Sequence, residues 1–140
     1  MKFRFDGYNY LVRLEKGEQL VATLVQFIKA NKVPSCWISG LGGAEQAEVG
    51  FYNLEKQEYE WRLVREPLEI ASLQGNISWV ASEPSLHIHG IFCKRDGKVV
   101  GGHVKEVVIN GTGEIFLHRW YGQNLNKTVD PAIGLKLLDL

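Results

Sequence analysis

One amphipathic helix followed by a long succession of strand-like segments constrains the fold of this chain most strongly. From Glu18 to Ala30 apolar residues recur at helical spacing, with Asn31 as the expected cap and Pro34 preventing continuation. Nearly every later segment has the alternation, or the β-branched and aromatic content, of a strand. This order predicts an α+β domain in which a flanking helix covers one face of a mainly antiparallel sheet. No repeat or linker interrupts the pattern, so we expect one domain over residues 1–140.

Glycine-containing segments divide the strand-like part of the chain. Asp96-Gly97 is a strong hairpin pattern, and Asn110 to Gly113 is expected to turn between two strands. Gly75-Asn76 is expected to form a bulge or bend within a long strand. The apolar tail from Val129 to Leu140 is expected to pack on the body or on a neighbouring subunit. The expected strands are Ser35–Leu41, Glu58–Leu63, Leu68–Val80, Leu86–Cys93, Val99–Ile109 and Glu114–Tyr121.

Charge balance and hydropathy narrow the functional class. Sixteen basic and sixteen acidic residues cancel, and no run of like charge exceeds two, which is a poor electrostatic footprint for nucleic acid. No apolar run approaches the roughly 18 residues of a membrane span, and no signal peptide is recognisable. We therefore expect a soluble, cytoplasmic protein without a membrane partner. Cys36 and Cys93 stand in apolar runs without paired spacing and are expected to be buried free thiols.

Three of the four histidines lie close together in the sequence, on two successive predicted strands. His87 and His89 alternate along one strand, so both imidazoles point to the same face of the sheet. His103 follows Gly101-Gly102 on the next strand, and these glycines allow the backbone to bend close to a ligand. Three imidazole nitrogens with an open fourth position form the ligand set of catalytic zinc sites. The alternative interpretation is three hydrogen-bonded histidines in a polar cleft or at an interface.

The register of the hairpin decides whether the metal site can form. A two-residue loop at Asp96-Gly97 would turn His103 away from His89. A three-residue loop from Arg95 to Gly97, with its glycine in the left-handed conformation, would set His103 opposite His89. A bulge at Gly101-Gly102 would have the same effect. The metal hypothesis therefore requires either the three-residue loop or the bulge.

Neutral imidazoles favour a divalent metal ion, with zinc or another late first-row metal expected. Water at the open position would become acidic enough to act as a nucleophile near neutral pH. Glu69 is the candidate carboxylate for acid/base chemistry or hydrogen bonding beside the metal, and its alternative role is an exposed or structurally paired acid. His118 is expected to be a surface or interface residue rather than a ligand. No nucleophile elbow, phosphate-binding loop or dinucleotide motif is present, so the residues assign no enzymatic reaction.

Several spaced motifs occur in a fixed order over nearly the whole chain. They are Gly17-Glu18, Ile38 to Ala44, Pro67 to Asn76, His87 to His89, and Asp96-Gly97 followed by Gly101 to His103. Together they resemble the plant and prokaryote conserved (PPC) domain, which occurs in plant AT-hook nuclear-localised proteins and in single-domain prokaryotic proteins. The resemblance implies an antiparallel sheet with flanking helices, assembled as a homotrimer. It also implies that His87, His89 and His103 bind a metal, usually zinc, as in prokaryotic members.

The chain differs from the plant members that it resembles. Those members lack the three histidines and carry Arg-Gly-Arg-Pro hooks that grip the minor groove of DNA, whereas this chain has the histidines and no hook. Three hypotheses follow. The chain is a trimeric metal-containing protein that acts on or senses a small molecule, a DNA-associated regulator as the family name suggests, or a structural module in which the metal only fixes the hairpin. The histidines favour the first.

Overall fold

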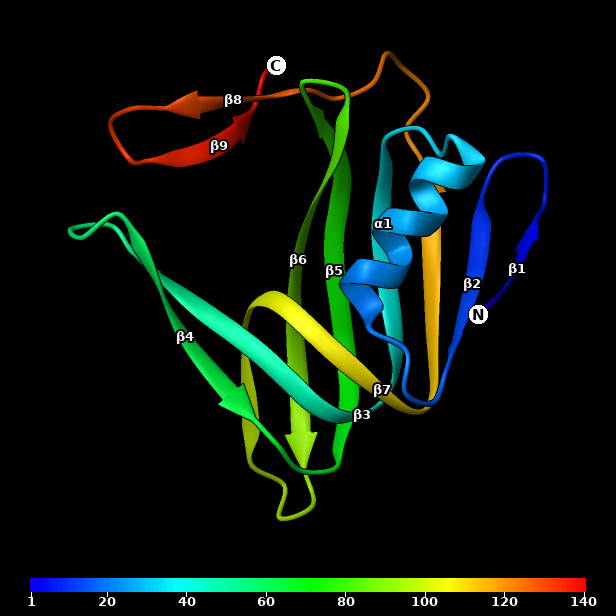
Figure 1. Ribbon diagram of the computed structural model, residues 1–140, viewed down its shortest axis with the longest axis vertical. Helices are drawn as coiled ribbons and strands as arrows, with labels where there is room; N and C mark the ends of the chain where they lie inside the picture. The colour runs from blue at the N-terminus through cyan, green and yellow to red at the C-terminus, as the bar shows by residue number, and fades with distance from the viewer.

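The computed structural model describes all residues from Met1 to Leu140 and contains one helix and nine strands (Figure 1). In chain order these are β1 (Lys2–Phe5), β2 (Tyr10–Glu15), α1 (Leu20–Asn31), β3 (Cys36–Asn53), β4 (Glu58–Val64), β5 (Leu68–Val80), β6 (Glu83–Lys94), β7 (Val99–Arg119), β8 (Lys127–Asp130) and β9 (Leu135–Leu138).

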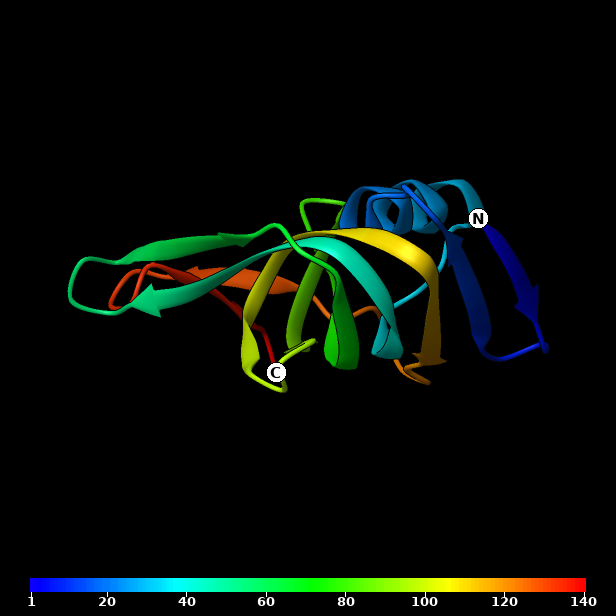
Figure 2. The ribbon, with the colours of Figure 1, turned by 90° about the horizontal axis from the view of Figure 1, so that it is seen from below.

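Seven strands form one sheet, and the last two form a separate hairpin. The order in the sheet is β1-β2-β7-β6-β5-β3-β4, with a further pairing between β7 and β3, and neighbouring strands are antiparallel throughout. Helix α1 lies against one face, and the sheet arches beneath it with its other face uncovered by any helix (Figure 2). The predicted α+β arrangement, a mainly antiparallel sheet with one flanking helix, is thereby confirmed.

The two longest strands bend midway and change partners. The first half of β3 pairs with β5 and the second half pairs with β4. The first part of β7 pairs with β6 and the last part pairs with β2. Register shifts between Gly42 and Ala44 mark the bend. The turn predicted from Asn110 to Gly113 is therefore wrong. Strand β7 continues through this segment because β3 pairs with both of its halves, with residues 110–112 bulged between them. The strand predicted at 35–41 continues to Asn53 because it pairs with both halves of β7.

Helix α1 is held at its start by a distant carboxylate. Its N-cap residue makes no side-chain hydrogen bond. Instead, Glu106 of β7 accepts hydrogen bonds from the backbone N–H groups of Val21 at 2.7 Å and Ala22 at 3.1 Å. At the other end Lys32, one residue beyond the expected cap Asn31, adopts the left-handed conformation. At 12 residues, α1 is too short a helix to cross a membrane.

Alternation along β6 separates a buried face from an open one. Ile88 and Phe92 face the helix side and are 1% and 0% exposed. His87 and His89, at the intervening positions, point to the opposite face and are both exposed. The histidines therefore lie on the face of the sheet that the helix does not cover.

Gly75 allows β6 to approach β5 closely beside the histidines. A Cβ atom at this position would lie 2.2 Å from the carbonyl oxygen of His87, which is shorter than any real contact. Pairing is regular here, with Asn76 opposite His87, and the register shifts between Ile70 and Ser72 instead. The bulge predicted at Gly75-Asn76 is therefore wrong, because this glycine serves the close approach of two backbones.

The C-terminal tail packs back on the body as the β8–β9 hairpin. The hydroxyl group of Tyr52 donates a hydrogen bond to the carbonyl oxygen of Ile133 at 2.7 Å. The side-chain amide of Gln57 donates to the carbonyl oxygen of Ala132 at 3.0 Å. The β3–β4 and β8–β9 hairpins consequently lie side by side (Figures 1 and 2). The expectation that the tail packs on the body is confirmed.

Candidate metal centre

The β6–β7 hairpin has the three-residue loop that the metal site requires. The N–H group of Gly97 donates to the carbonyl oxygen of Lys94 at 2.9 Å, which closes the turn. Gly97 has φ +80°, in the left-handed region where glycine carries no steric penalty. This loop places His103 directly opposite His89. Pairing beyond the loop is regular, so the alternative bulge before His103 does not form.

Three imidazoles converge on the open face of the sheet. Potential ligand atoms of His87, His89 and His103 all lie within 4.8 Å of one another. The Nε2 atoms of His87 and His89 are 3.2 Å apart. Two nitrogens bound to one zinc ion at about 2.05 Å in tetrahedral geometry lie about 3.3 Å apart. The buried Nδ1 atom of His103 has no hydrogen-bond partner. The donor atoms and their spacing therefore fit a divalent metal ion.

Partial burial favours the neutral, metal-binding form of His103 and His87. The pKa of His103 is lowered to about 4, first by desolvation and then by the neighbouring His87, His89 and Lys127 in that order. The pKa of His87 is also lowered, first by burial and then by Lys127 and His89. Because an imidazole nitrogen must be deprotonated to coordinate a metal, both side chains are available for coordination at neutral pH.

Gly50 leaves space for an aromatic wall beside His103. It lies on β3 between His103 of β7 and Trp61 of β4 in one cross-strand row. A Cβ atom at Gly50 would lie 2.7 Å from the ring of Trp61. The ring of Tyr59 is centred 4.7 Å from the rings of both His103 and Trp61. Strand alternation did not identify these rings as part of the site, because the contact crosses three strands.

The C-terminal hairpin closes one side of the site. A cavity of about 310 Å³ lies between the hairpin and the histidines. Lys127, at the start of β8, is half-buried in its wall, and burial and then Lys136 lower the pKa of its ammonium group. Nothing in the tail sequence distinguishes Lys127, because only the docking of the hairpin brings it to the histidines. The cavity is lined by Tyr59, Ser85, Leu86, His87, His103, Lys127, Gly134, Leu135, Lys136 and Leu137.

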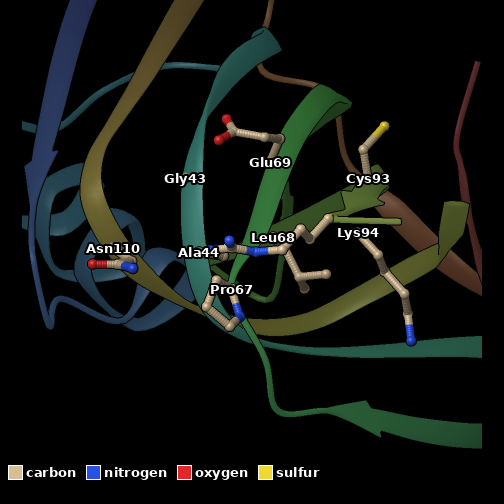
Figure 3. Close-up of a pocket in the computed structure, with 9 residues that line it drawn as sticks. Gly43, Ala44, Pro67, Leu68, Glu69, Cys93, Lys94 and Asn110 are labelled. Atoms are coloured by element: carbon tan, nitrogen blue, oxygen red, sulfur yellow. The ribbon is translucent and has the colours of Figure 1, made fainter. Parts of the chain in front are cut away.

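Glu69 lies in another hollow, away from the histidines. In the β5–β6 ladder it pairs with Cys93, four residues along β6 from His89, or about 13 Å at 3.3 Å per residue. Figure 3 shows the Glu69 carboxylate and the Lys94 ammonium group pointing to opposite sides of this hollow. Strand pairing therefore does not bring Glu69 to the other candidate site residues.

The residues of β5 nearest to the histidines are amides rather than acids. Gln74 lies opposite His89, and Asn76 lies opposite His87. Asn76 is 9% exposed, and its buried Oδ1 atom has no hydrogen-bond partner. An acceptor beside a ligand can fix the orientation of an imidazole. Neither amide supplies negative charge to the site.

The fourth histidine and the two cysteines lie outside the cluster. His118 is exposed on β7, with its ring centred 4.5 Å from that of Phe116. Cys36 is buried and Cys93 is partly exposed, and both are free thiols. The predictions that His118 lies on the surface and that the cysteines are unpaired agree with this placement, although Cys93 is less buried than expected.

The chain is similar to one protein family and to several solved structures. The model of the Plants and Prokaryotes Conserved (PCC) domain matches residues 1–120. A metal-containing protein from Archaeoglobus fulgidus is 36% identical, with a TM-score of 0.89 and coverage of 100% of both chains. A plant- and prokaryote-conserved (PPC) protein from Pyrococcus horikoshii is 30% identical, with a TM-score of 0.89 over 99% of this chain and 95% of that chain. A candidate DNA-binding protein from Bacteroides thetaiotaomicron is 28% identical, with a TM-score of 0.94 over 99% and 96%. Among curated proteins, no sequence matches this chain.

Proposed function

The chain belongs to the Plants and Prokaryotes Conserved domain family, and from that premise we propose that it is a metal-binding protein whose metal, zinc, faces a small molecule. The ligands are His87, His89 and His103. One observation carries the proposal: three imidazoles converge within 4.8 Å, and two of their Nε2 atoms stand 3.2 Å apart. The metal-containing protein from Archaeoglobus fulgidus, similar over the whole chain, supports it.

Side chains around the proposed site leave one side open to a small molecule and shield another side from solvent. His87, His89 and His103 would hold the ion, which would supply Lewis-acid chemistry to a bound small molecule or water. The stacked rings of Tyr59 and Trp61 shield His103 from solvent. The C-terminal hairpin narrows the approach from the other side. The cavity between the hairpin and the histidines therefore gives a small molecule one route to the ion.

Metal analysis of protein purified without a histidine tag tests this proposal. Wild type is expected to contain about one zinc ion per chain, and the double variant His87→Ala with His103→Ala is expected to contain none. His118→Ala is the matched control, because this histidine lies outside the cluster and its loss leaves the metal content unchanged. Wild type without stoichiometric metal, or a double variant that retains it, would contradict the proposal.

The proposal includes assembly as a homotrimer through the open face of the sheet. Leu11, Trp37 and Leu41 are 42%, 53% and 54% exposed there. Leu11 and Leu41 border a hollow of about 430 Å³ that also includes Phe116 and His118. Contiguous apolar surface of this kind is typical of protein interfaces. The sequence resemblance described above implies the same assembly.

Light scattering coupled to size-exclusion chromatography tests the assembly. Three chains of 15.8 kDa give an expected mass of about 47 kDa. Leu41→Glu is expected to lower the mass by placing a charge in the apolar patch. Leu54→Glu is the matched control, since Leu54 is 61% exposed in the β3–β4 turn, away from the patch. A monomeric wild type would remove assembly from the proposal without affecting the metal site.

DNA association is the second candidate function, because the similar protein from Bacteroides thetaiotaomicron is described as a candidate DNA-binding protein. The balanced charge of this chain gives little electrostatic attraction to phosphates. A titration of duplex DNA across a salt series decides the matter. Binding that weakens steeply with salt would support a DNA-associated role, and absence of binding at low salt would exclude a direct one.

A further inference from the structure

The cavity beside the metal centre has an unbalanced charge. Its lining contains Lys127 and Lys136 and no carboxylate. Neither lysine forms an ion pair anywhere in the structure. Lys127 is half-buried and makes no side-chain hydrogen bond, so its ammonium group is only partly solvated and has no protein partner. Positive charge that is withdrawn from water is costly until an anion or acceptor meets it.

The metal ligands add to this imbalance. Three neutral imidazoles leave both charges of a divalent ion uncompensated. The amides of Gln74 and Asn76, on the neighbouring strand, supply no negative charge. The candidate carboxylate Glu69 lies in a different hollow. A negative charge at this site must therefore come from a ligand.

Four residues give the cavity an apolar part, and Ser85 and Gly134 complete its lining. Leu86 comes from β6, Leu135 and Leu137 come from β9, and the ring of Tyr59 comes from β4. At about 310 Å³, the cavity is at the small end of the range of about 300–1,000 Å³ for small-molecule sites. These walls favour an anion with a short apolar group over a fully hydrated inorganic ion.

We infer that the cavity binds a small organic carboxylate, whose negative group meets Lys127 and the open metal position while its apolar part contacts the leucines. The inference rests on the proposed metal site, because the ion contributes two of the positive charges that the carboxylate meets. Lys127 acts as a binding residue that touches the carboxylate. Lys136 is more exposed and adds long-range attraction.

Calorimetric titration of the zinc-loaded full-length protein with three probes tests the inference. Isobutyrate carries a carboxylate and a short apolar group, isobutyramide is its neutral analogue of the same shape, and inorganic phosphate is an anion without an apolar part. Isobutyrate is expected to bind, and isobutyramide is expected to bind at least tenfold more weakly. Phosphate is expected to bind more weakly than isobutyrate, because it gains nothing from the apolar walls. These comparisons use wild-type protein alone and require no variant to fold.

Variants at Lys127 then locate the carboxylate. Lys127→Met keeps the length of the side chain but removes its charge, and about a tenfold or greater loss of isobutyrate affinity is expected. Lys127→Arg is expected to restore most of the affinity. Lys16→Met is the matched control, since Lys16 is exposed in the connection from β2 to α1 and, like Lys127, forms no ion pair. Metal content is measured in every sample, and the thermal unfolding curve confirms folding.

The outcomes separate the two proposals. Stoichiometric zinc together with isobutyrate binding that depends on Lys127 supports the inference. Stoichiometric zinc with equal binding of isobutyrate and isobutyramide, or with no loss in Lys127→Met, overturns the inference and leaves the metal site standing. Phosphate binding as tight as that of isobutyrate overturns the organic class of the ligand. A wild type that holds no zinc overturns the metal site and this inference with it.

Discussion

The two faces of the sheet differ in what positions their side chains. Under α1, Ile88 and Phe92 are fixed by packing and have almost no exposed surface. On the open face, His87 and His89 occupy alternate positions of the same strand, and backbone register rather than packing sets their places. The buried side chains on the helix face therefore stabilise the fold, whereas the open face presents the candidate metal ligands. Substitutions are expected to separate stability from metal binding along this division.

The largest effect is expected from Phe92→Ala, on the helix face. Removing a ring that is 0% exposed leaves a cavity in the core and should lower the free energy of unfolding by about 3–5 kcal/mol. Ile91→Ala is the neighbouring control on the open face, where Ile91 is 49% exposed. Denaturant unfolding measures both. A comparable loss in Ile91→Ala would contradict the expected difference in stability between the two faces.

A smaller loss is expected from Glu106→Ala, which removes the carboxylate at the start of α1. The N–H groups of Val21 and Ala22 lose their acceptor, which should lower the free energy of unfolding by about 1–2 kcal/mol. Glu106→Gln keeps one acceptor oxygen and should retain part of the stability. Denaturant unfolding and metal content are measured together, with metal content expected to stay constant. Loss of metal in a folded Glu106→Ala protein would show that the two faces are coupled.

Gly97→Ala is expected to affect the open face more than the helix face. No atom lies within 4 Å of the added Cβ, so the strain comes only from φ +80° and should amount to about 1–2 kcal/mol. Gly97→Asn should cost less, because asparagine tolerates the left-handed conformation. We expect zinc affinity to fall in Gly97→Ala, because relief of the strain shifts His103 relative to His89. Competition with a zinc chelator measures this, and equal affinities in both variants would contradict the dependence on register.

Tyr52→Phe should loosen the C-terminal hairpin without unfolding the sheet. The lost hydrogen bond to the carbonyl oxygen of Ile133 should lower the local stability by about 1 kcal/mol. Faster proteolytic cleavage after residue 120 is expected, with the cleavage sites identified by mass spectrometry. Tyr8→Phe is the control, since Tyr8 is 59% exposed. Equal cleavage in both variants would mean that Tyr52 does not hold the hairpin.

The smallest effect on stability is expected from the cysteines at pH 8. Burial raises the pKa of the Cys36 thiol to about 11, so this thiol stays protonated and should resist iodoacetamide, whereas the partly exposed Cys93 should react. Because the raised pKa belongs to the folded state, Cys36 contributes stability below pH 9 that is lost as the pH rises to about 11. Peptide mapping at pH 8 measures the alkylation of each cysteine, and denaturant unfolding at pH 8 and at about pH 11 measures the change in stability. Alkylation of Cys36 in folded protein at pH 8 would contradict its burial.

Local patterns predicted much of the fold and the ligand set but not the surroundings of the ligands. Alternation put His87 and His89 on one face, and Gly97 identified the loop that brings His103 opposite His89. Glycines elsewhere were misleading, because Gly75 and the segment from Asn110 to Gly113 looked like bends or turns. In the structure, Gly75 allows two strands to approach closely, and the segment from Asn110 to Gly113 lies at a bend within one strand. Sequence alone does not distinguish these uses, since each depends on what a distant strand places opposite the glycine.

By itself, the sequence determined the single helix, the strand periodicity and the three histidines that can share a metal, because these depend on neighbours a few residues apart. Only the tertiary structure decided that the ring of Tyr59 packs against His103 and that Lys127 lines the same cavity as two of the histidines. It also decided that Glu69 lies in a different hollow. These contacts join segments far apart in the chain, and a shift of one residue in any pairing would move their side chains to the other face. Their positions follow from the packing of the whole sheet rather than from any local pattern.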